Sequence, residues 1–315
     1  MITKKRKVNS LRQVQFCSFN EEQHISALTT ILQHPSLLEH LHLSGKFQVD
    51  LYKLLNRFTR HNSNSLSQPS QLKSLELVDF CIPNEPENNI FFESFFNYFQ
   101  HIERLKMDFY AAPAHNLEAE RDYRRKLVEA IGHQLHELRY LYLDFAPRDS
   151  RDTAVCFCDN FVTTLCDWNQ KLETLCLSNL PISDDMLLDL CHHPTLHTLN
   201  LVGRQIHEQL TKDGWISFAR KLKEQEQNNN NRIQSLFLSC NYRGHVTDEV
   251  LQELAGVESL KNLRIEGSRY ITKAGINKFV SINNSSTKNH TKIELYCCNL
   301  VSLDNPHVVF VPSPF

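Results

Sequence analysis

Residues 172–177 read LETLCL and residues 196–201 read LHTLNL, and this phrase, Leu-x-x-Leu-x-Leu, decides the fold. Three more copies start at Leu38, Leu72 and Leu138, and variants with other apolar residues start at Leu11, Ile102, Ile233, Leu260 and, more weakly, His290. Consecutive starts lie between 24 residues (172 to 196) and 37 residues (196 to 233) apart. The chain is therefore a tandem array of about ten unequal repeats.

Each phrase predicts a β-strand followed by a helix. Its last two apolar residues lie two positions apart, so both side chains point into the core and the residue between them points outward. Amphipathic segments follow the strands, and we expect helices over Glu21–Gln33, Val49–Arg60, Asn89–Gln100, Glu118–Gln134, Asp152–Trp168, Asp184–Cys191, Glu208–Gln225, Asp248–Val257 and Lys273–Ile282. Ser183 and Thr247 are expected to cap two of these helices.

One strand and one helix cannot bury their apolar faces alone, so the repeats must stack. We expect an α/β leucine-rich repeat solenoid, a horseshoe of about ten repeats with an inner parallel β-sheet and outer helices. The repeat domain is expected to be continuous over 11–303, after a basic N-terminal tail at 1–10. Residues 304–315 form a C-terminal tail or cap, or Val308–Val311 adds as an edge strand.

Charge and composition favour a soluble protein without a nucleic-acid or membrane partner, and we expect a monomer. The net charge of −2 provides no global field that would attract an anionic polymer or surface. No stretch approaches the roughly 20 consecutive apolar residues of a membrane span. The basic run from Lys4 to Val8 is either a nuclear import signal or a solvated tail, so we expect a cytoplasmic or nuclear location, or both.

Sequence signatures of enzymes and cofactor sites are absent, so we expect neither catalysis nor a cofactor. The chain has no G-x-S-x-G, no His-Glu-x-x-His and only eight glycines for phosphate-binding loops. Its ten cysteines include no Cys-x-x-Cys pair, which favours buried packing over zinc or disulfides. His40, His42 and Glu76 share a strand face and are in principle a metal site, but a solvated polar patch is the favoured interpretation.

The outward residues of the strands line the face on which we expect a partner. Their central column is Gln15, His42, Glu76, Lys106, Tyr142, Cys176, Asn200, Phe237, Arg264 and Glu294. Tyr140, Tyr142 and Phe237 are the main candidates, because an aromatic ring facing solvent suits an interface. Their high strand propensity is the alternative explanation. Lys106, Arg264 and His42 complete the candidate binding residues on this face.

The rim where strands lead into helices is the second candidate surface. Arg204 and Tyr242 are the binding candidates there, and Tyr270 is a further candidate. Phe80, Phe109 and Phe145 follow their strands closely, so we expect these three rings to close the core of their repeats.

The irregular period, the long helices and the Cys or Asn after some strands resemble the ribonuclease-inhibitor-like superfamily, and within it the F-box leucine-rich repeat proteins. The residues are Cys240 with Asn241 and Cys297, Cys298 with Asn299, and the resemblance covers about residues 11 to 300. Other repeats depart from it, with Lys46, Ala146 and Arg204 at that position.

The resemblance implies a non-catalytic scaffold that recognises another protein, as the substrate-binding repeats of a ubiquitin-ligase receptor do, with ligase components as further partners. Ten residues before Leu11 are too few for an F-box, so we expect only the recognition half of such a receptor. Two alternatives remain open: a regulator of a small GTPase, as in the superfamily's GTPase-activating members, and an enzyme inhibitor of the ribonuclease-inhibitor type.

Overall fold

The protein is described from a computed structural model. It describes residues 13–18, 20–32, 38–45, 49–50, 54, 56–58, 69–82, 92–111, 117–147, 165, 167, 169–180, 182–203, 209–227, 233–239, 245–285, 291–296 and 308–311. The chain divides into two compact units, residues 1–152 and residues 153–315. One continuous repeat domain over 11–303 stays a prediction, and the predicted basic tail at 1–10 lies outside the described residues.

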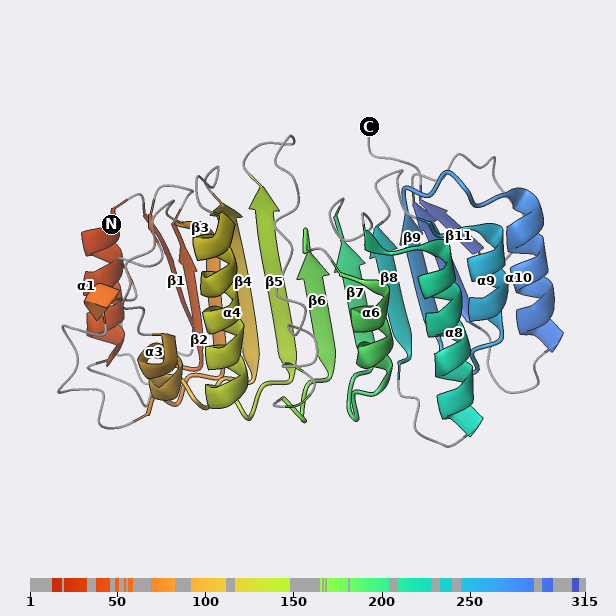
Figure 1. Cartoon of the computed structure of the whole chain (residues 1–315). Coiled ribbons are helices and arrows are strands. Elements are labelled where there is room, and N and C mark those ends of the chain that lie inside the picture. The colour runs from red at the N-terminus through yellow and green to blue at the C-terminus, as the bar shows by residue number, and fades with distance from the viewer. Residues whose placement is uncertain are drawn as a thin grey trace. The chain divides into compact units, whose positions relative to one another are not determined.

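All ten repeat phrases form β-strands (Figure 1). Unit 1 contains β1 (Gln13–Cys17), β2 (His40–Ser44), β3 (Ser74–Ile82), β4 (Arg104–Ala111) and β5 (Tyr140–Pro147). Unit 2 contains β6 (Thr174–Ser178), β7 (Thr198–Val202), β8 (Ser235–Ser239), β9 (Asn262–Glu266), β10 (Lys292–Tyr296) and β11 (Val308–Val311). Within each unit, neighbouring strands pair in parallel and in chain order. Val308–Val311 thus adds as an edge strand, the alternative considered for the C-terminal tail.

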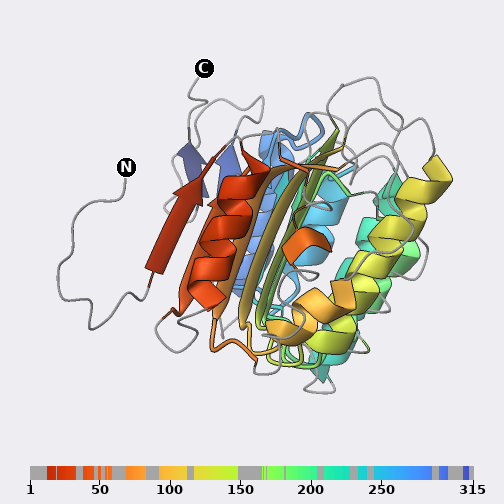
Figure 2. The same ribbon diagram turned by 90° about the vertical axis from the view of Figure 1, so that its left-hand side faces the viewer.

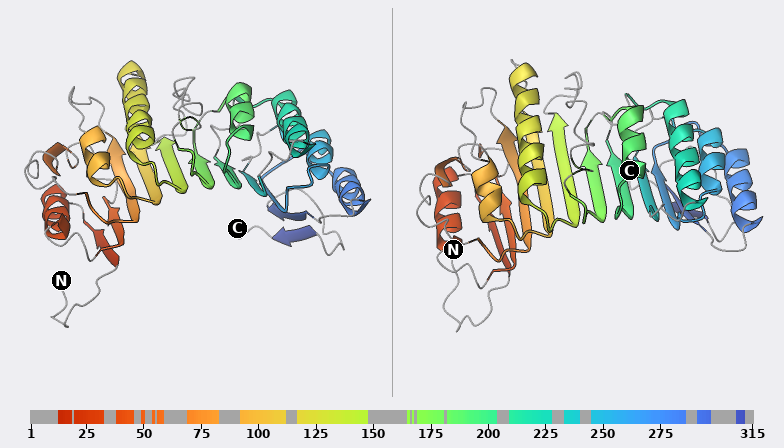
Figure 3. Two further views of the ribbon diagram at one scale, coloured as in Figure 1. Left: turned by 90° about the horizontal axis from the view of Figure 1, so that it is seen from below. Right: turned by 60° about the horizontal axis from the view of Figure 1, so that its bottom comes forward.

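The helices of each unit lie on one face of its strands (Figures 2 and 3). Unit 1 has α1 (Glu21–Leu32), α3 (Phe92–Tyr98) and α4 (Leu117–Gln134), and unit 2 has α6 (Asp184–Cys191), α8 (Lys212–Gln227), α9 (Asp248–Ala255) and α10 (Lys273–Ser285). Most of the predicted helices over 49–60 and 152–168 lies outside the described residues. This arrangement confirms the α/β leucine-rich repeat fold. None of the described helices is long and apolar enough to cross a bilayer.

The apolar residues of the phrases form the core of each unit. Leu41 and Leu43 of β2 are buried, as are Leu199 and Leu201 of β7. Burying a leucine side chain fully contributes roughly 1.5–3 kcal/mol, so the recurring leucines make stacking of the repeats favourable. The prediction that three phenylalanines close the core is confirmed, because the side chains of Phe80, Phe109 and Phe145 are buried.

The position two residues after the last apolar residue of a strand has a left-handed backbone in several repeats. Asp79, Asn179, Gly203 and Gly267 occupy this position, with φ values of 59°, 54°, 101° and 73°. Asn, Asp and Gly tolerate this region better than other residues do. The backbone N–H of Asn179 donates to the carbonyl of Val202, 2.9 Å away, so the turn continues the hydrogen bonding between neighbouring repeats.

A carboxylate at the start of α6 caps the next helix in the chain. Asp184 accepts hydrogen bonds from the backbone N–H of Thr211 at 2.9 Å and from its hydroxyl at 2.6 Å. The Thr211 hydroxyl oxygen accepts in turn from the backbone N–H of Gly214, also at 2.9 Å. Because α8 begins at Lys212, this chain of bonds joins the N-termini of two neighbouring helices.

The same link recurs between α9 and α10. Asp248 accepts from the backbone N–H of Thr272 at 2.7 Å and from its hydroxyl at 2.5 Å, and Gly275 donates its N–H to that hydroxyl at 3.2 Å. The predicted cap at Ser183 is confirmed, because its hydroxyl accepts from the N–H of Met186. Thr247 lies at the predicted N-cap position of α9, but its hydroxyl makes no capping hydrogen bond.

Two buried histidines also connect repeats. His193 Nε2 lies 3.1 Å from the carbonyl oxygen of Asn169, and the N–H of Thr195 approaches His193 Nδ1 at 3.4 Å. His24 lies between the rings of Phe16 and Phe80, and burial lowers the pKa of both histidines below 6.5. The neutral imidazole fits both environments. His193 therefore connects the end of its own helix to the preceding repeat.

We expect Gly214→Ala and Gly275→Ala each to lower the free energy of unfolding by about 1–3 kcal/mol, the usual cost of overpacking. A Cβ at Gly214 would collide with the carboxylate of Asp184, and a Cβ at Gly275 with that of Asp248. Gly256→Ala is the matched control, because its Cβ would meet the far end of the long Lys223 side chain, with Cε at 2.8 Å, which can shift more easily than a hydrogen-bonded carboxylate. Urea unfolding measures the free energy of unfolding of the three variants. Equal stabilities would contradict a close fit of the two glycines against the carboxylates of Asp184 and Asp248.

We expect the stability that His24 and His193 contribute to be lost when the pH is lowered from 7 to 5. Well above pH 6.5 both histidines are neutral in the folded protein and in the unfolded chain, and as the pH falls through 6.5 the unfolded chain binds protons that the folded protein resists, because the pKa of both is lowered by burial. The raised pKa of Asp108 acts in the opposite direction, so the test compares variants and not the total change. The loss of stability between pH 7 and pH 5 should be smaller in His193→Gln than in the wild-type protein. His245→Gln, which changes an exposed histidine, should leave the loss unchanged. Thermal midpoints measured across this pH range give the comparison.

Candidate functional site

The predicted central column is confirmed in register within each unit. In unit 1 the paired positions run Gln15, His42, Glu76, Lys106 and Tyr142 across β1 to β5. In unit 2 they run Cys176, Asn200, Phe237, Arg264 and Glu294 across β6 to β10. No described helix covers this face of the strands in either unit (Figure 3, left). Among the described elements, the face is thus open to a partner.

In unit 1 each candidate tyrosine is covered by a cation from the neighbouring strand. The guanidinium carbon of Arg104 lies 4.4 Å from the centre of the Tyr140 ring, and Lys106 Nζ lies 5.1 Å from that of Tyr142. The Tyr142 hydroxyl donates to a carboxylate oxygen of Asp144, 3.2 Å away. Both rings are half-buried. Cation–π contact holds such rings in one orientation, so the patch is ordered before a partner arrives.

In unit 2 the aromatic candidate is part of a sandwich. The guanidinium of Arg264 lies between the rings of Phe237 and Tyr296, with its carbon 4.4 Å and 3.9 Å from their centres. Beside it, Glu294 accepts from Lys292 at 2.6 Å and from the Tyr296 hydroxyl at 3.4 Å. The hydrogen bond from Lys292 is the main reason why the pKa of Glu294 is lowered. The two rings thus hold the guanidinium in place, although its Nε is buried and has no hydrogen-bond partner among the described residues.

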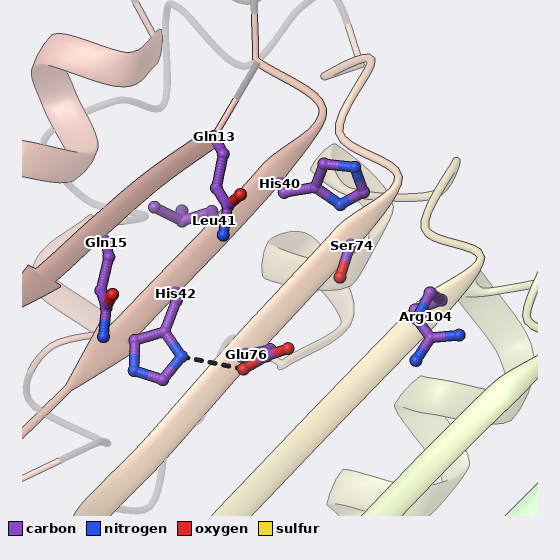
Figure 4. Close-up of a pocket in the computed structure, with 8 residues that line it drawn as sticks. All are labelled: Gln13, Gln15, His40, Leu41, His42, Ser74, Glu76 and Arg104. Atoms are coloured by element: carbon purple, nitrogen blue, oxygen red, sulfur yellow. Dashed lines mark hydrogen bonds and ion pairs between the residues drawn. The ribbon is translucent and has the colours of Figure 1, made fainter. Parts of the chain in front are cut away.

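A polar cleft of about 400 Å³ lies on the strand face of unit 1, over β1 to β4 (Figure 4). It is lined by Gln13, Gln15, His40, Leu41, His42, Ser74, Glu76 and Arg104. Nδ1 of His42 lies 2.8 Å from a carboxylate oxygen of Glu76, and this pair spans β2 and β3. Among the described residues, no group of three or more His, Cys, Asp or Glu side chains has the arrangement of a metal site.

An acidic cluster lies beyond the tyrosines, toward the carboxyl ends of β3 to β5. The pKa of Asp108 is raised to about 6, mainly by burial and then by the nearby carboxylates of Asp144 and Asp79, while Lys106 opposes them. Asp79 is itself held, since it accepts a hydrogen bond of 3.0 Å from the Ser44 hydroxyl. Asp108 therefore destabilises the folded state when it is charged.

The structure brings together only some of the predicted site residues. His42, Lys106, Tyr140 and Tyr142 share the face of unit 1, while Phe237 and Arg264 share that of unit 2. The rim candidates Arg204 and Tyr242 lie outside the described residues. On the same rim, Tyr270 is 54% exposed.

Two residues of the cleft, Gln13 and Ser74, were not among the residues predicted for this face. Both lie two positions along the strand from the central column, so they point to the same face. That spacing was the signal in the sequence that could have added them. Arg104 in the cleft and Tyr296 on Arg264 lie in the columns that flank the central one, where the alternation of strand residues places them.

Cysteines do not form a site in the described part of the chain. Cys176 and Cys191 are buried free thiols, which agrees with packing, whereas Cys17 is exposed. Cys176 accepts a hydrogen bond of 2.9 Å from the side-chain amide of Asn200.

Comparison with known proteins gives a structural match but no sequence match. No family model matches the chain, and no curated protein matches it significantly. Among solved structures, the crystal structure of a TLR13–ssRNA13 complex matches with a TM-score of 0.45 and 14% identity. The match covers 93% of this chain and 37% of that chain. The expected absence of a nucleic-acid partner stays a prediction.

We expect Asp108→Asn to stabilise the protein at pH 7.5. The ordinary pKa of this carboxyl is 3.8, so the folded state holds its proton more tightly than the unfolded chain does. The gain should be about 1 kcal/mol after discounting for solvent screening, and it should shrink as the pH falls from about 6 toward 4.

The matched control for this experiment is Asp167→Asn, which changes an exposed carboxylate of unit 2. Urea unfolding at several pH values measures both variants. A loss of stability in Asp108→Asn at pH 7.5, or an equal gain in the control, would show that Asp108 is not strained by its surroundings.

Proposed function

We propose that the protein is a non-catalytic scaffold that recognises another protein through the open face of its strands. The observation that carries the proposal is the pair of ordered rings in unit 1, Tyr140 beneath Arg104 and Tyr142 beneath Lys106. Aromatic and arginine side chains dominate the binding energy of many protein interfaces. Rings already held in place lose little conformational entropy when they bind, which favours affinity.

The mixed charge of the face also supports a protein partner. Basic Arg104 and Lys106 alternate with acidic Glu76, Asp108 and Asp144 over neighbouring strands. Such a mixture gives specificity through complementary pairs without a strong field of one sign. It offers no special support for an inhibitor of a basic nuclease, which would be favoured by a uniformly acidic face.

The finer proposal is a substrate receptor that works with a ubiquitin ligase. Its support is the resemblance of the repeats to F-box leucine-rich repeat proteins, carried by the Cys or Asn after some strands, such as Cys240 and Asn241. In this model the strand face holds the substrate. A regulator of a small GTPase and an inhibitor of the ribonuclease-inhibitor type are the other outcomes that an experiment must separate.

Affinity purification from cell extract, followed by mass spectrometry, tests the proposal. The wild-type chain is compared with a Tyr140→Ala, Tyr142→Ala double variant and with a Phe237→Ala variant, and circular dichroism checks that each is folded. We expect a bound protein to be lost, by tenfold or more, from the Tyr140→Ala, Tyr142→Ala variant. That is about 1.4 kcal/mol or more of binding free energy.

Tyr270→Ala is the matched control, because it removes an exposed ring from the rim. We expect it to retain the partner. Loss of the partner only in Tyr270→Ala would move the site to the rim and contradict the proposed face. Cullin-ligase components together with a client would support the receptor, whereas a small GTPase or a nuclease would favour one of the alternatives.

A further inference from the structure

The cleft on unit 1 contains hydrogen-bond donors that the protein does not use. In the part of the chain that the structure describes, the guanidinium of Arg104 makes no hydrogen bond and no ion pair, and its contact is the Tyr140 ring. The side chains of Gln13, Gln15 and His40 likewise make no hydrogen bond to a described residue. In Figure 4 these groups surround the hollow from β1, β2 and β4. The cleft is therefore rich in free donors.

The one acidic group of the cleft is already engaged. Glu76 accepts from His42 at 2.8 Å, which draws one of its oxygens toward β2 and away from Arg104 on β4. No ion pair joins Arg104 to Glu76, although their strands are neighbours. The guanidinium thus keeps its full hydrogen-bonding capacity for a ligand.

Contact with the Tyr140 ring restricts the position of that guanidinium, whose carbon lies 4.4 Å from the ring centre. A guanidinium is a planar fork of N–H groups, the arrangement that binds a carboxylate through two parallel hydrogen bonds. Ordering a free arginine side chain on binding costs conformational entropy. Because the Tyr140 ring already restricts Arg104, less entropy is lost when a ligand binds.

We infer that this cleft binds the carboxylate of an Asp or Glu side chain on the partner protein, with Arg104 as its main contact. The inference deepens the proposed function and rests on it. Glu76 explains why a carboxylate is favoured over a phosphate: the cleft holds one fixed cation against one fixed anion, and a phosphate brings a charge of about −1.5 to −2 close to Glu76.

The position of the cleft fits a partner segment that also reaches the tyrosines. Neighbouring strands lie about 4.8 Å apart, and an extended chain spans about 3.3–3.6 Å per residue. Arg104 lies on β4 and Tyr142 on β5, so one or two residues separate the acidic side chain from a side chain over the Tyr142 ring. The recognised segment has an acidic residue close to an apolar one.

The test uses small probes that need no identified partner. N-acetyl-glutamate N-methylamide is titrated into the full chain, and the imidazole signals of ¹³C-labelled His40 and His42 are followed by NMR. N-acetyl-glutamine N-methylamide, which has the same shape without the charge, is the control. We expect the glutamate probe to shift these signals with at least tenfold higher affinity. Equal affinities would overturn the proposal.

Variants assign the contact. Arg104→Gln should weaken binding of the glutamate probe about tenfold or more, while Arg220→Gln, the same change on the outer face of α8, should leave it unchanged. Glu76→Gln should strengthen binding several-fold, because it removes the like charge while keeping an acceptor for His42. A merely structural role for Glu76 predicts the opposite direction, and weaker binding in Glu76→Gln would contradict the inference.

A phosphoserine probe distinguishes a phosphate from a carboxylate. If phosphoserine binds more tightly than the glutamate probe, the cleft is not a carboxylate site.

N-acetyl-alanine, which has a free C-terminal carboxylate, distinguishes a chain terminus from an acidic side chain. If it binds more tightly than the glutamate probe, the ligand is not an Asp or Glu side chain. Failure here is distinguishable from failure of the proposed function, because the probes report on the cleft alone and affinity purification reports on the tyrosine face.

Discussion

Burial of the two inner apolar residues of each strand is the constraint on which the rest of the structure depends. A single repeat places Leu199 and Leu201 on the inward side of one strand, where its own helix cannot enclose them. Neighbouring repeats must complete the enclosure, which requires parallel strands in register. That register aligns the outward residues of the central column with their counterparts on the neighbouring strand within each unit. Both the core and the candidate binding face follow from this one requirement.

The sequence was sufficient for the strands because the signal is local and repeated. A spacing of two between apolar residues identifies each strand. Because the phrase occurs ten times, chance does not explain the pattern. Contacts between repeats were harder to predict. Thr247 has the residue type of a cap but makes no capping bond, while Asp184 caps a helix that begins at Lys212, far along the chain. Such bonds depend on how the coils stack, which a local pattern does not encode.

The candidate site was predictable to a similar degree. The alternation of strand residues placed Tyr142 and Lys106 on one face, and their register confirms it. The sequence did not reveal that the rings are covered by cations, or that Arg104 has no hydrogen-bonding partner among the described residues. These properties depend on side-chain conformations across strands. Exposed aromatic residues were the correct signal for the face, but the unpaired donor beside them is the more specific feature.

The links between helix N-termini make the coils of unit 2 unequal. Each coil is one strand with the helix that follows it. The coils of α6 and α9 supply a carboxylate, that of Asp184 or Asp248. The coils of α8 and α10 donate hydrogen bonds to it from a threonine that is followed three residues later by a glycine. Among the described helices of unit 2, supplier and receiver therefore alternate. Removing the coil of α9 alone would leave the N-terminus of α10 without its carboxylate, whereas removing α9 and α10 together would take away the carboxylate and the helix that it caps.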